Sequence, residues 1–464
     1  MQLKPDPTFY PSAKMAMQAP SEKLAYVAML SKTGNGKRDA LAVVDVDPSS
    51  KTYGTRVGQV EMTKDDDELH HFGWNACSAA LCPYAPHPHV ERRYLIVTGL
   101  RSSRIYIIDT KPDPRNPKIV RVIEPEEVIS KTGYSRLHTT HCGPDGIYIS
   151  ALGSADGKGP GGVLKLDHYD FKVSGPWEAD RGPQYLAYDF FWHLGHDVMV
   201  TSEWGTPDMI EDGVNPELLL GGKYGHQLHF FDLRKRTHLQ TVDLGPEYQA
   251  VLELRPSHDP TKTYGFTNTV ISLKDLSSSI WVWHRDNGKW AVTKVIDIPA
   301  EPADESVLPP LLKVFKAVPP LVSDIDLSLD DRFLYVSCWG TGELRQYDVS
   351  DPFKPKQTGS VHIGGIVRRT PHPAKPNEKR NGGPQMVEIS RDGKRVYFTN
   401  SLYRSWDEQF YPDGINGWMV KLNTGDNGGI TFDEKLFLEF DDRRPHQVRL
   451  EGGDASSDSY CFPP

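Results

Sequence analysis

Ten consecutive residues combine side chains that suit transition-metal or redox chemistry. The stretch Glu68-Leu-His-His-Phe-Gly-Trp-Asn-Ala-Cys77 holds a carboxylate, two adjacent imidazoles, an indole, an amide and a thiol. Few structural roles require this mixture, whereas a metal site could use most of it. We therefore take His70 and His71 as the first candidate metal ligands and ask which residues the fold would bring to them.

Short apolar runs separated by turns dominate the chain and predict an all-β fold. Glycine (40) and proline (37) make up about a sixth of the 464 residues and punctuate runs of β-branched and aromatic side chains. A strand, an Asp-Gly-type turn and two further strands recur along the chain. We expect six interior units of this kind, at roughly 70–125, 138–178, 184–244, 249–298, 322–363 and 384–440.

The two ends of the chain are predicted to build a seventh unit. Apolar runs at 24–30 and 40–46 flank Asn35-Gly36 and predict a hairpin that lacks strands for a sheet of its own. The run 447–450 can supply the missing strand. The result is one seven-bladed β-propeller over 23–464, closed by the N- and C-terminal strands. Residues 1–22 are expected to be an irregular lead-in, and 310–317 a short helix within a loop.

In a propeller, the inner strand of each blade lines a central channel, so the starts of these strands become neighbours. On a strand, the i, i+3 spacing of His138 and His141 puts the two rings on opposite faces, and we favour His141 as the ligand. Aligning the units brings these candidates toward one opening: His70, His71, His138, His141, His446, Asp324 and Asp326. Several neutral imidazoles without a set of thiolates favour copper, zinc or iron over calcium or magnesium.

Composition argues against several other classes of protein. A net charge of -9 and the lack of a basic, aromatic-rich patch argue against a nucleic-acid partner. No apolar run approaches the ~18 residues that a membrane span needs. No signal peptide is visible in residues 1–20, so a cytoplasmic location is expected. The five cysteines, an odd number in a long chain, predict no disulfide framework and fit a reducing compartment, with Cys77 and Cys142 in core packing.

The stretch Asp67–Cys77 resembles the signature of the selenium-binding protein family, whose members include methanethiol oxidases. Further matching stretches extend from about residue 24 to the C-terminus, among them 137–142, 201–204, 327–335 and 452–458. The resemblance implies a seven-bladed propeller and the conversion of methanethiol, dioxygen and water to formaldehyde, hydrogen sulfide and hydrogen peroxide. It implicates copper, a small volatile thiol and O2 as partners, a selenium species as a further candidate ligand, and, by motif, His70, His71, His138, His141 and His446.

Within this hypothesis, two carboxylates and one indole receive roles near the metal. Glu68 or Asp326 would accept a proton or orient an imidazole, and Trp74 would exclude water. Aspartates such as Asp324 and Asp326 are more often turn or strand-end caps than metal ligands. Two alternatives stay open: a non-catalytic carrier or scaffold that binds selenium or a metal, and a zinc- or calcium-dependent, lactonase-like hydrolase. A histidine-rich, carboxylate-poor ligand set would weaken the hydrolase.

Overall fold

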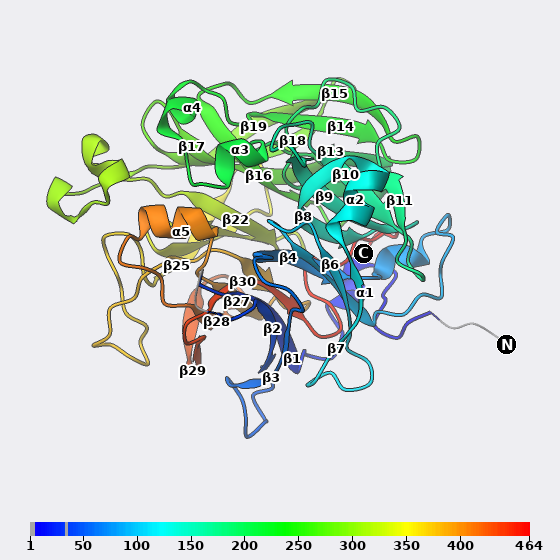
Figure 1. Cartoon of the computed structure of the whole chain (residues 1–464), viewed down its shortest axis with the longest axis horizontal. Coiled ribbons are helices and arrows are strands. Elements are labelled where there is room, and N and C mark those ends of the chain that lie inside the picture. Colours follow the sequence, from blue (N-terminus) through cyan, green and yellow to red (C-terminus); the bar gives the residue numbers. More distant parts are fainter. Residues whose placement is uncertain (1–4, 33–35) are drawn as a thin grey trace.

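The chain folds into seven antiparallel sheets of four strands each, arranged around a central channel. The computed structural model describes residues 5–32 and 36–464, and these counts refer to them. Figure 1 shows β4, β8, β16, β22 and β30 near the centre, whereas β3, β15 and β29 lie toward the rim. The predicted all-β, seven-bladed β-propeller is confirmed.

Each interior sheet uses four consecutive strands, the first of which lies at the channel. The first three sheets comprise β4 (Leu69–Trp74), β5 (Tyr94–Gly99), β6 (Ile105–Asp109) and β7 (Lys118–Ile123); β8 (Tyr134–Cys142), β9 (Ile147–Ser154), β10 (Gly162–Leu166) and β11 (Val173–Pro176); and β12 (Phe190–His193), β13 (Val198–Thr201), β14 (Gln227–Asp232) and β15 (Thr237–Asp243). The next three comprise β16 (Tyr248–Pro256), β17 (Tyr264–Ser272), β18 (Ser278–Asp286) and β19 (Lys289–Ile298); β22 (Val322–Leu327), β23 (Phe333–Cys338), β24 (Glu343–Asp348) and β25 (Lys356–His362); and β26 (Val387–Ile389), β27 (Arg395–Thr399), β28 (Trp418–Thr424) and β29 (Ile430–Glu439).

Both ends of the chain build the remaining sheet, as predicted. From the channel outward its strands are β30 (Arg444–Leu450), β1 (Leu24–Leu30), β2 (Ala40–Asp45) and β3 (Arg56–Glu61). The antiparallel pairing of β30 with β1 places Val448 opposite Val27. This pairing closes the ring by hydrogen bonds between the two ends of the chain. The turn predicted around Asn35 lies outside the described residues.

Burial explains why the strands are of two kinds. β1 and β2 are buried along their whole length, and all their residues except Asp45 are apolar, because neighbouring blades cover both faces. β3, at the rim, carries polar residues and is partly exposed. Trp74 belongs to the core between two blades: its ring packs edge-on against Tyr26 at 5.7 Å, and its Nε1 donates to the carbonyl of Leu450. The prediction that Trp74 shields the histidines is therefore wrong.

Helices are short and lie in the loops between strands. The α-helices are α1 (Ala13–Ala16), α2 (Pro125–Thr132), α3 (Pro207–Ile210), α4 (Pro216–Leu220) and α5 (Arg404–Phe410), and the 3-10 helices are η1 (Ser78–Leu81), η2 (Leu194–His196), η3 (Glu305–Val307) and η4 (Pro310–Phe315). η4 confirms the helix expected at 310–317, and α1 is a single turn within the segment expected to be irregular. A two-stranded sheet, β20 (Glu301–Pro302) and β21 (Ala317–Val318), closes the arm that carries η3 and η4. Among the described helices, none has the length and apolar character needed to cross a membrane.

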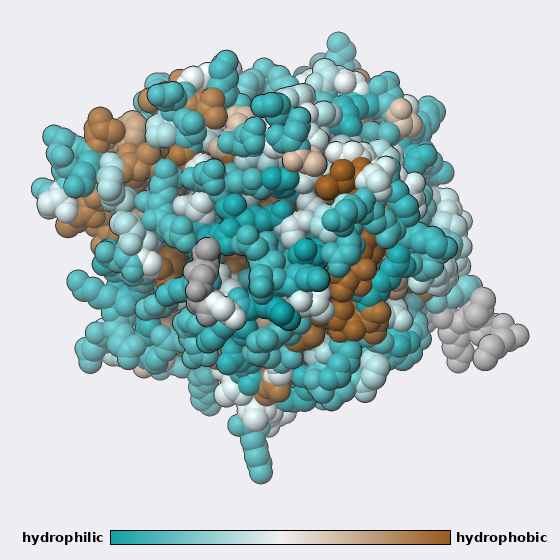
Figure 2. Space-filling view, in the orientation of Figure 1, coloured by the Kyte–Doolittle hydropathy of each residue, from teal (hydrophilic) through white to brown (hydrophobic). Residues whose placement is uncertain are grey.

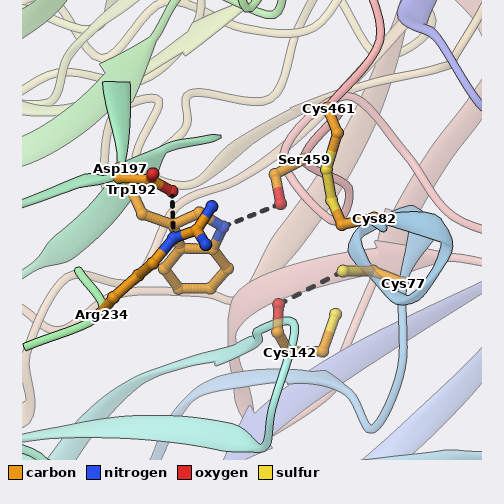
Figure 3. The surroundings of a disulfide bond; sticks show 8 residues. All are labelled: Cys77, Cys82, Cys142, Trp192, Asp197, Arg234, Ser459 and Cys461. Carbon is orange, nitrogen blue, oxygen red and sulfur yellow. Dashed lines mark hydrogen bonds and ion pairs between the residues drawn. A yellow bond between two sulfur atoms is a disulfide. The ribbon is translucent and has the colours of Figure 1, made fainter. Parts of the chain in front are cut away.

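One disulfide joins the C-terminal segment to the propeller, although the cysteine count predicted no disulfide framework. Cys82 and Cys461 are bonded although 379 residues separate them (Figure 3). β30 returns the chain to the first sheet, so the residues after it lie beside η1, a proximity that the linear sequence does not reveal. Cys77 and Cys142 are unbonded and buried in the same apolar cluster, as predicted, and the Cys77 thiol donates to the carbonyl of Cys142 at 3.2 Å.

Candidate metal centre

Four buried imidazoles meet at one end of the channel. His70 and His71 come from β4, His138 from β8 and His446 from β30. The Nδ1 atom of His70 lies 3.1 Å from Nε2 of His138, and the ring centroids of His70 and His446 are 3.6 Å apart. One nitrogen from each of His70, His71 and His446 lies within 4.8 Å of the other two. In the described part of the chain, these three histidines form a group whose ligand atoms lie close enough together to hold one metal ion.

A β-bulge in each contributing strand turns these side chains into the channel. The pairing register of β4 shifts between Leu69 and Phe72, so an extra residue is inserted and adjacent histidines share one side. The His70 and His71 rings are accordingly stacked, with an interplanar angle of 7°. The same kind of shift occurs in β8 between Leu137 and Thr140, and in β30 around His446.

The bulge in β8 also explains why His138 rather than His141 joins the cluster. Because the bulge breaks the alternation of side chains, the spacing rule that favoured His141 does not apply. His141 packs against Phe191 with ring centroids 4.6 Å apart. Burial, with Arg449 and Arg255 nearby, holds the pKa of His141 well below its usual range. His141 is therefore a neutral histidine outside the four-imidazole cluster.

Backbone carbonyls orient two of the imidazoles. His70 donates through Nε2 to the carbonyl of Leu402 at 2.8 Å, and His446 donates through Nδ1 to the carbonyl of Ser401 at 2.7 Å. Since a carbonyl only accepts, the opposite nitrogen of each ring carries a lone pair. The hydroxyl of Thr139 contacts Nδ1 of His138 at 3.1 Å and Nδ1 of His71 at 3.5 Å. Partners of this kind fix the rings of metal-binding histidines.

The cluster suits a metal that prefers neutral nitrogen ligands. Burial lowers the pKa of His70 to about 4, against the opposing charge of Glu68. Burial likewise lowers the pKa of His71, His138 and His446 well below the usual range, so the rings are neutral at pH 7. The Nε2 atoms of His71 and His446 are buried without a hydrogen-bond partner. Such unpartnered imidazole nitrogens fit copper or zinc.

Aromatic side chains cover the cluster on one side. The Tyr188 ring lies 4.3 Å from His138, and the Tyr403 ring lies 5.3 Å from His70. Trp204 packs edge-on against both tyrosines, at 5.3 and 5.6 Å. The Tyr403 hydroxyl and the Trp204 Nε1 are buried and have no partner. This aromatic layer keeps bulk water from the imidazoles and leaves two polar atoms available to a small ligand.

Neither predicted catalytic carboxylate bonds to an imidazole in the described structure. Glu68 accepts hydrogen bonds from the guanidinium of Arg101 and, at 2.7 Å, from the backbone N–H of Arg404. Burial opposes its ionisation, but Arg101 and Arg404 hold the pKa of Glu68 below its usual value. Asp326 lies elsewhere in the channel, 3.4 Å from the guanidinium of Arg255. Glu68 therefore anchors two arginines beside the site, and Asp326 belongs to a separate charged network.

Sequence reasoning missed the groups that surround the imidazoles. The carbonyls of Ser401 and Leu402 carry no side-chain signal, and their position depends on the loop that leads into α5. Nothing in the sequence distinguishes Tyr188 and Tyr403 from other aromatic residues. Thr139 was within reach of sequence reasoning, because it directly follows His138 and its hydroxyl is a common partner for a ring nitrogen.

Comparison with known proteins identifies the family. The profile described as 56kDa selenium binding protein matches residues 3–461. Methanethiol oxidase of Xenopus tropicalis is 39% identical over 470 residues, which cover 96% of each chain. Selenium-binding protein 2 of Mus musculus is 38% identical, with 97% of each chain covered.

Solved structures agree with this assignment. The X-ray structure of a hypothetical selenium-binding protein from Sulfolobus tokodaii is 63% identical, with a TM-score of 0.96 that covers 99% of this chain and 100% of that one. A periplasmic gluconolactonase from Pseudomonas aeruginosa, at 11% identity and a TM-score of 0.55, shares the propeller fold alone. The chain belongs to the selenium-binding protein family.

Proposed function

We propose that this protein is a copper-dependent methanethiol oxidase that forms formaldehyde, hydrogen sulfide and hydrogen peroxide from methanethiol, dioxygen and water. The observation that carries the proposal is the buried imidazole cluster with its unpartnered nitrogens. Full-length relatives named methanethiol oxidase, in Xenopus tropicalis and Homo sapiens among others, support the reaction. Bound copper would supply the electron-transfer chemistry that allows a thiol to react with dioxygen.

The side chains of the site have separate tasks in this proposal. His70, His71 and His446 would hold the metal, with His138 as a fourth imidazole beside them. The carbonyls of Leu402 and Ser401 keep two of these rings in a fixed orientation. The aromatic layer of Tyr188, Trp204 and Tyr403 excludes water from the reacting thiol.

An apolar crevice beside the aromatic layer supports a small uncharged substrate. Its volume is about 60 Å³, and Trp204 forms part of its wall together with side chains of α4, η4 and α5 such as Leu219, Leu312 and Trp406. No charged side chain lines it in the described structure. Figure 2 shows apolar side chains gathered over the α4 region of the surface. A crevice of this size and polarity admits methanethiol and disfavours large or charged thiols.

The hydrolase alternative lacks its carboxylates at this site. Asp324 and Asp326 are both paired with Arg255 rather than placed among the imidazoles. A calcium-dependent hydrolase needs several oxygen ligands together, and the described residues offer a nitrogen cluster instead. A non-catalytic carrier does not need oxygen ligands at this site. An activity assay distinguishes the carrier from the oxidase.

Oxygen uptake with methanethiol tests the proposal. Protein loaded with copper, loaded with zinc, or metal-free is given methanethiol in a closed oxygen-electrode cell, and sulfide and peroxide are measured in the same sample. We expect the copper form alone to consume oxygen and to release sulfide and peroxide in equal amounts. Copper bound without any turnover would overturn the oxidase and favour the carrier.

A further inference from the structure

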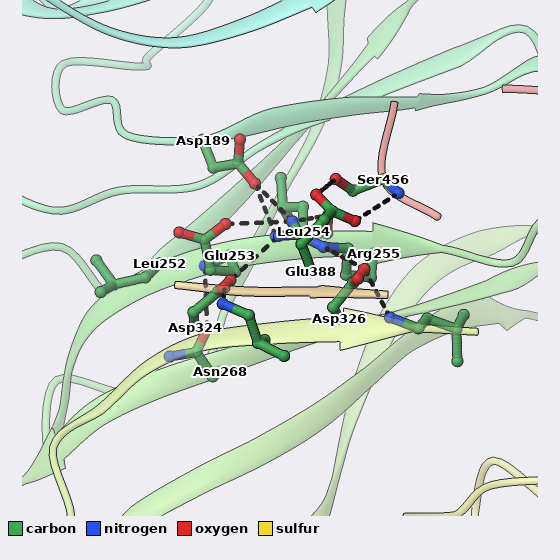
Figure 4. Close-up of polar contacts among 12 residues, drawn as sticks. Asp189, Leu252, Glu253, Leu254, Arg255, Asn268, Asp324, Asp326, Glu388 and Ser456 are labelled. Atoms are coloured by element: carbon green, nitrogen blue, oxygen red, sulfur yellow. Dashed lines mark hydrogen bonds and ion pairs between the residues drawn. The ribbon is translucent and has the colours of Figure 1, made fainter. Parts of the chain in front are cut away.

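The channel contains far more buried carboxylates than buried cations. Six acidic side chains line it, and in the described structure their guanidinium partners belong to two arginines. Figure 4 shows the part of this set around Arg255, with Glu388 beside it. If every group were ionised, four negative charges would be uncompensated among buried side chains. The acids are Asp189, Glu253, Asp324, Asp326, Glu388 and Asp454, and the arginines are Arg255 and Arg449.

These groups form one continuous network. The guanidinium of Arg255 lies 3.6 Å from Asp189, 3.2 Å from Glu253, 3.1 Å from Asp324 and 3.4 Å from Asp326. Arg449 pairs in the same way with Glu388 and Asp454. The two halves meet at the backbone N–H of Ile389, which donates to Asp326 at 3.2 Å and to Glu388 at 3.1 Å.

The excess of carboxylates requires bound protons. An ionised carboxylate without a partner is strongly disfavoured away from water and takes up a proton instead. Burial raises the pKa of Asp324 to about 8 and of Asp326 to about 6, although Arg255 opposes both shifts. Burial also raises the pKa of Glu253 and Glu388 well above the usual range. Some of these groups are therefore neutral carboxylic acids at pH 7.

The network lies next to the imidazole cluster at Tyr188. The Tyr188 hydroxyl donates to Glu253 at 3.2 Å, while its ring lies against His138. The Oδ1 atom of Asp189 and both polar side-chain atoms of Gln385 are buried without a partner. Buried polar groups without a protein partner are typical binding sites for internal water, which can carry protons.

Three further titratable side chains face the network: His141, His258 and Tyr188. His141 on β8 is close to both arginines, and burial keeps the pKa of its ring well below the usual range. His258 follows β16, and its Nε2 contacts the carbonyl of Leu327 at 3.0 Å. Burial raises the pKa of Tyr188 well above its usual value, so its hydroxyl is neutral. Neither His141 nor Tyr188 therefore offsets the excess charge, which proton uptake by the carboxylates compensates.

We propose that this carboxylate network is a proton store for the metal centre, loaded with exchangeable protons at pH 7 and connected to the imidazoles at Glu253 and Tyr188. Its use in turnover rests on the proposed oxidase function. Methanethiol loses two electrons and two protons, one from sulfur and one from carbon, to give a thioaldehyde that water converts to formaldehyde and hydrogen sulfide. Dioxygen takes up the two electrons and two protons to give hydrogen peroxide. The carboxylate network would accept these protons while the thiol is oxidised and return them while dioxygen is reduced, with internal water as the carrier between the imidazoles and Glu253.

Infrared spectroscopy of the full chain tests whether the store is loaded. Protonated carboxyl groups absorb infrared light at a different frequency from ionised carboxylates, and their bands shift in D2O. We expect such bands at pH 7, their loss at alkaline pH, and a smaller signal in Asp324→Asn and Glu253→Gln. Glu305→Gln, which changes an exposed carboxylate, should leave the bands unchanged. A wild-type spectrum without protonated carboxyl bands at pH 7 would overturn the proposal.

Copper titration of the metal-free protein tests the connection without relying on turnover. A cation entering the imidazole cluster lowers the pKa of nearby carboxylic acids, and the histidines are already neutral. We therefore expect wild-type protein to release protons into a weakly buffered solution at pH 7 as copper binds. Glu253→Gln should release fewer protons at equal copper content, and equal release would overturn the connection. Absence of oxidase activity would refute the proposed function and leave both of these results standing.

Discussion

The Nδ1 atom of His70 lies 3.1 Å from the Nε2 atom of His138, although 68 residues separate them along the chain. Because His70 donates its ring proton to the carbonyl of Leu402, its Nδ1 is the acceptor in this contact. The contact joins the inner strands of two neighbouring blades at the channel. It therefore ties the orientation of the candidate metal ligands to the packing of the propeller itself.

The hydroxyl of Thr139 is predicted to orient two of the imidazoles. Thr139→Val removes a group that contacts Nδ1 of both His138 and His71 while keeping a side chain of similar shape. Loss of such a partner typically lowers metal affinity by ~10–100-fold. The measurement is copper affinity by competition with a chelator. Thr140→Val is the matched control, because its hydroxyl has no partner, and equal affinities for the two variants would contradict this role.

Glu68 is predicted to contribute to stability rather than to metal binding. Its carboxylate is buried and accepts hydrogen bonds from Arg101 and Arg404. In Glu68→Gln these cations lose a charged partner, and we expect the free energy of unfolding to fall by about 1–3 kcal/mol. Urea unfolding measures the change, and copper content should remain that of the wild type. If the variant had normal stability but lost copper, this prediction would be wrong, and Glu68 would instead orient an imidazole.

The blades were predictable from the sequence because their signals are local. Turn residues and β-branched runs mark most strands, and the short C-terminal run 447–450, in which polar and apolar residues alternate, pairs with β1. The choice between His138 and His141 was not predictable, because the bulge in β8 depends on how that strand pairs with β9. The same limit applies to the Cys82–Cys461 disulfide and to the carbonyls of Ser401 and Leu402, which tertiary structure alone brings into place.

Stability is predicted to fall as the pH rises from 7 to about 8, with Asp324 as one cause. Burial raises the pKa of this carboxyl from 3.8 to about 8. At pH 7 the folded state keeps the proton and the unfolded state has lost it, so stability decreases with rising pH until the folded state also ionises near pH 8. Buried histidines with lowered pKa values affect stability below pH ~6.5 and do not mask this window.

Asp324→Asn tests this pH dependence. We expect the urea midpoint of the wild type to decrease between pH 7 and pH 8. The variant has no carboxyl to ionise at this position, so its midpoint should change less over the same range. Parallel curves for the two proteins would show that Asp324 does not carry the raised pKa.

The disulfide is predicted to stabilise the fold by holding the C-terminal segment. Cys82 and Cys461 close a loop of 379 residues, and cross-links of this kind typically contribute about 2–4 kcal/mol. Reductant should lower the unfolding midpoint of the wild type by a corresponding amount. Cys461→Ser should show the lower midpoint at once and no further change with reductant. If reductant lowered the unfolding midpoint of this variant by the same amount, the effect of reductant would not come from the Cys82–Cys461 disulfide.

Copper content of single histidine variants tests the central claim most directly. We measure bound copper per chain by mass spectrometry for the wild type, His446→Ala and His141→Ala, with circular dichroism to confirm the fold. His446 belongs to the imidazole cluster, whereas His141 is a buried histidine outside it. We predict one copper in the wild type and in His141→Ala, and loss of copper from folded His446→Ala. Full copper in His446→Ala, or loss from folded His141→Ala, would contradict the four-imidazole centre.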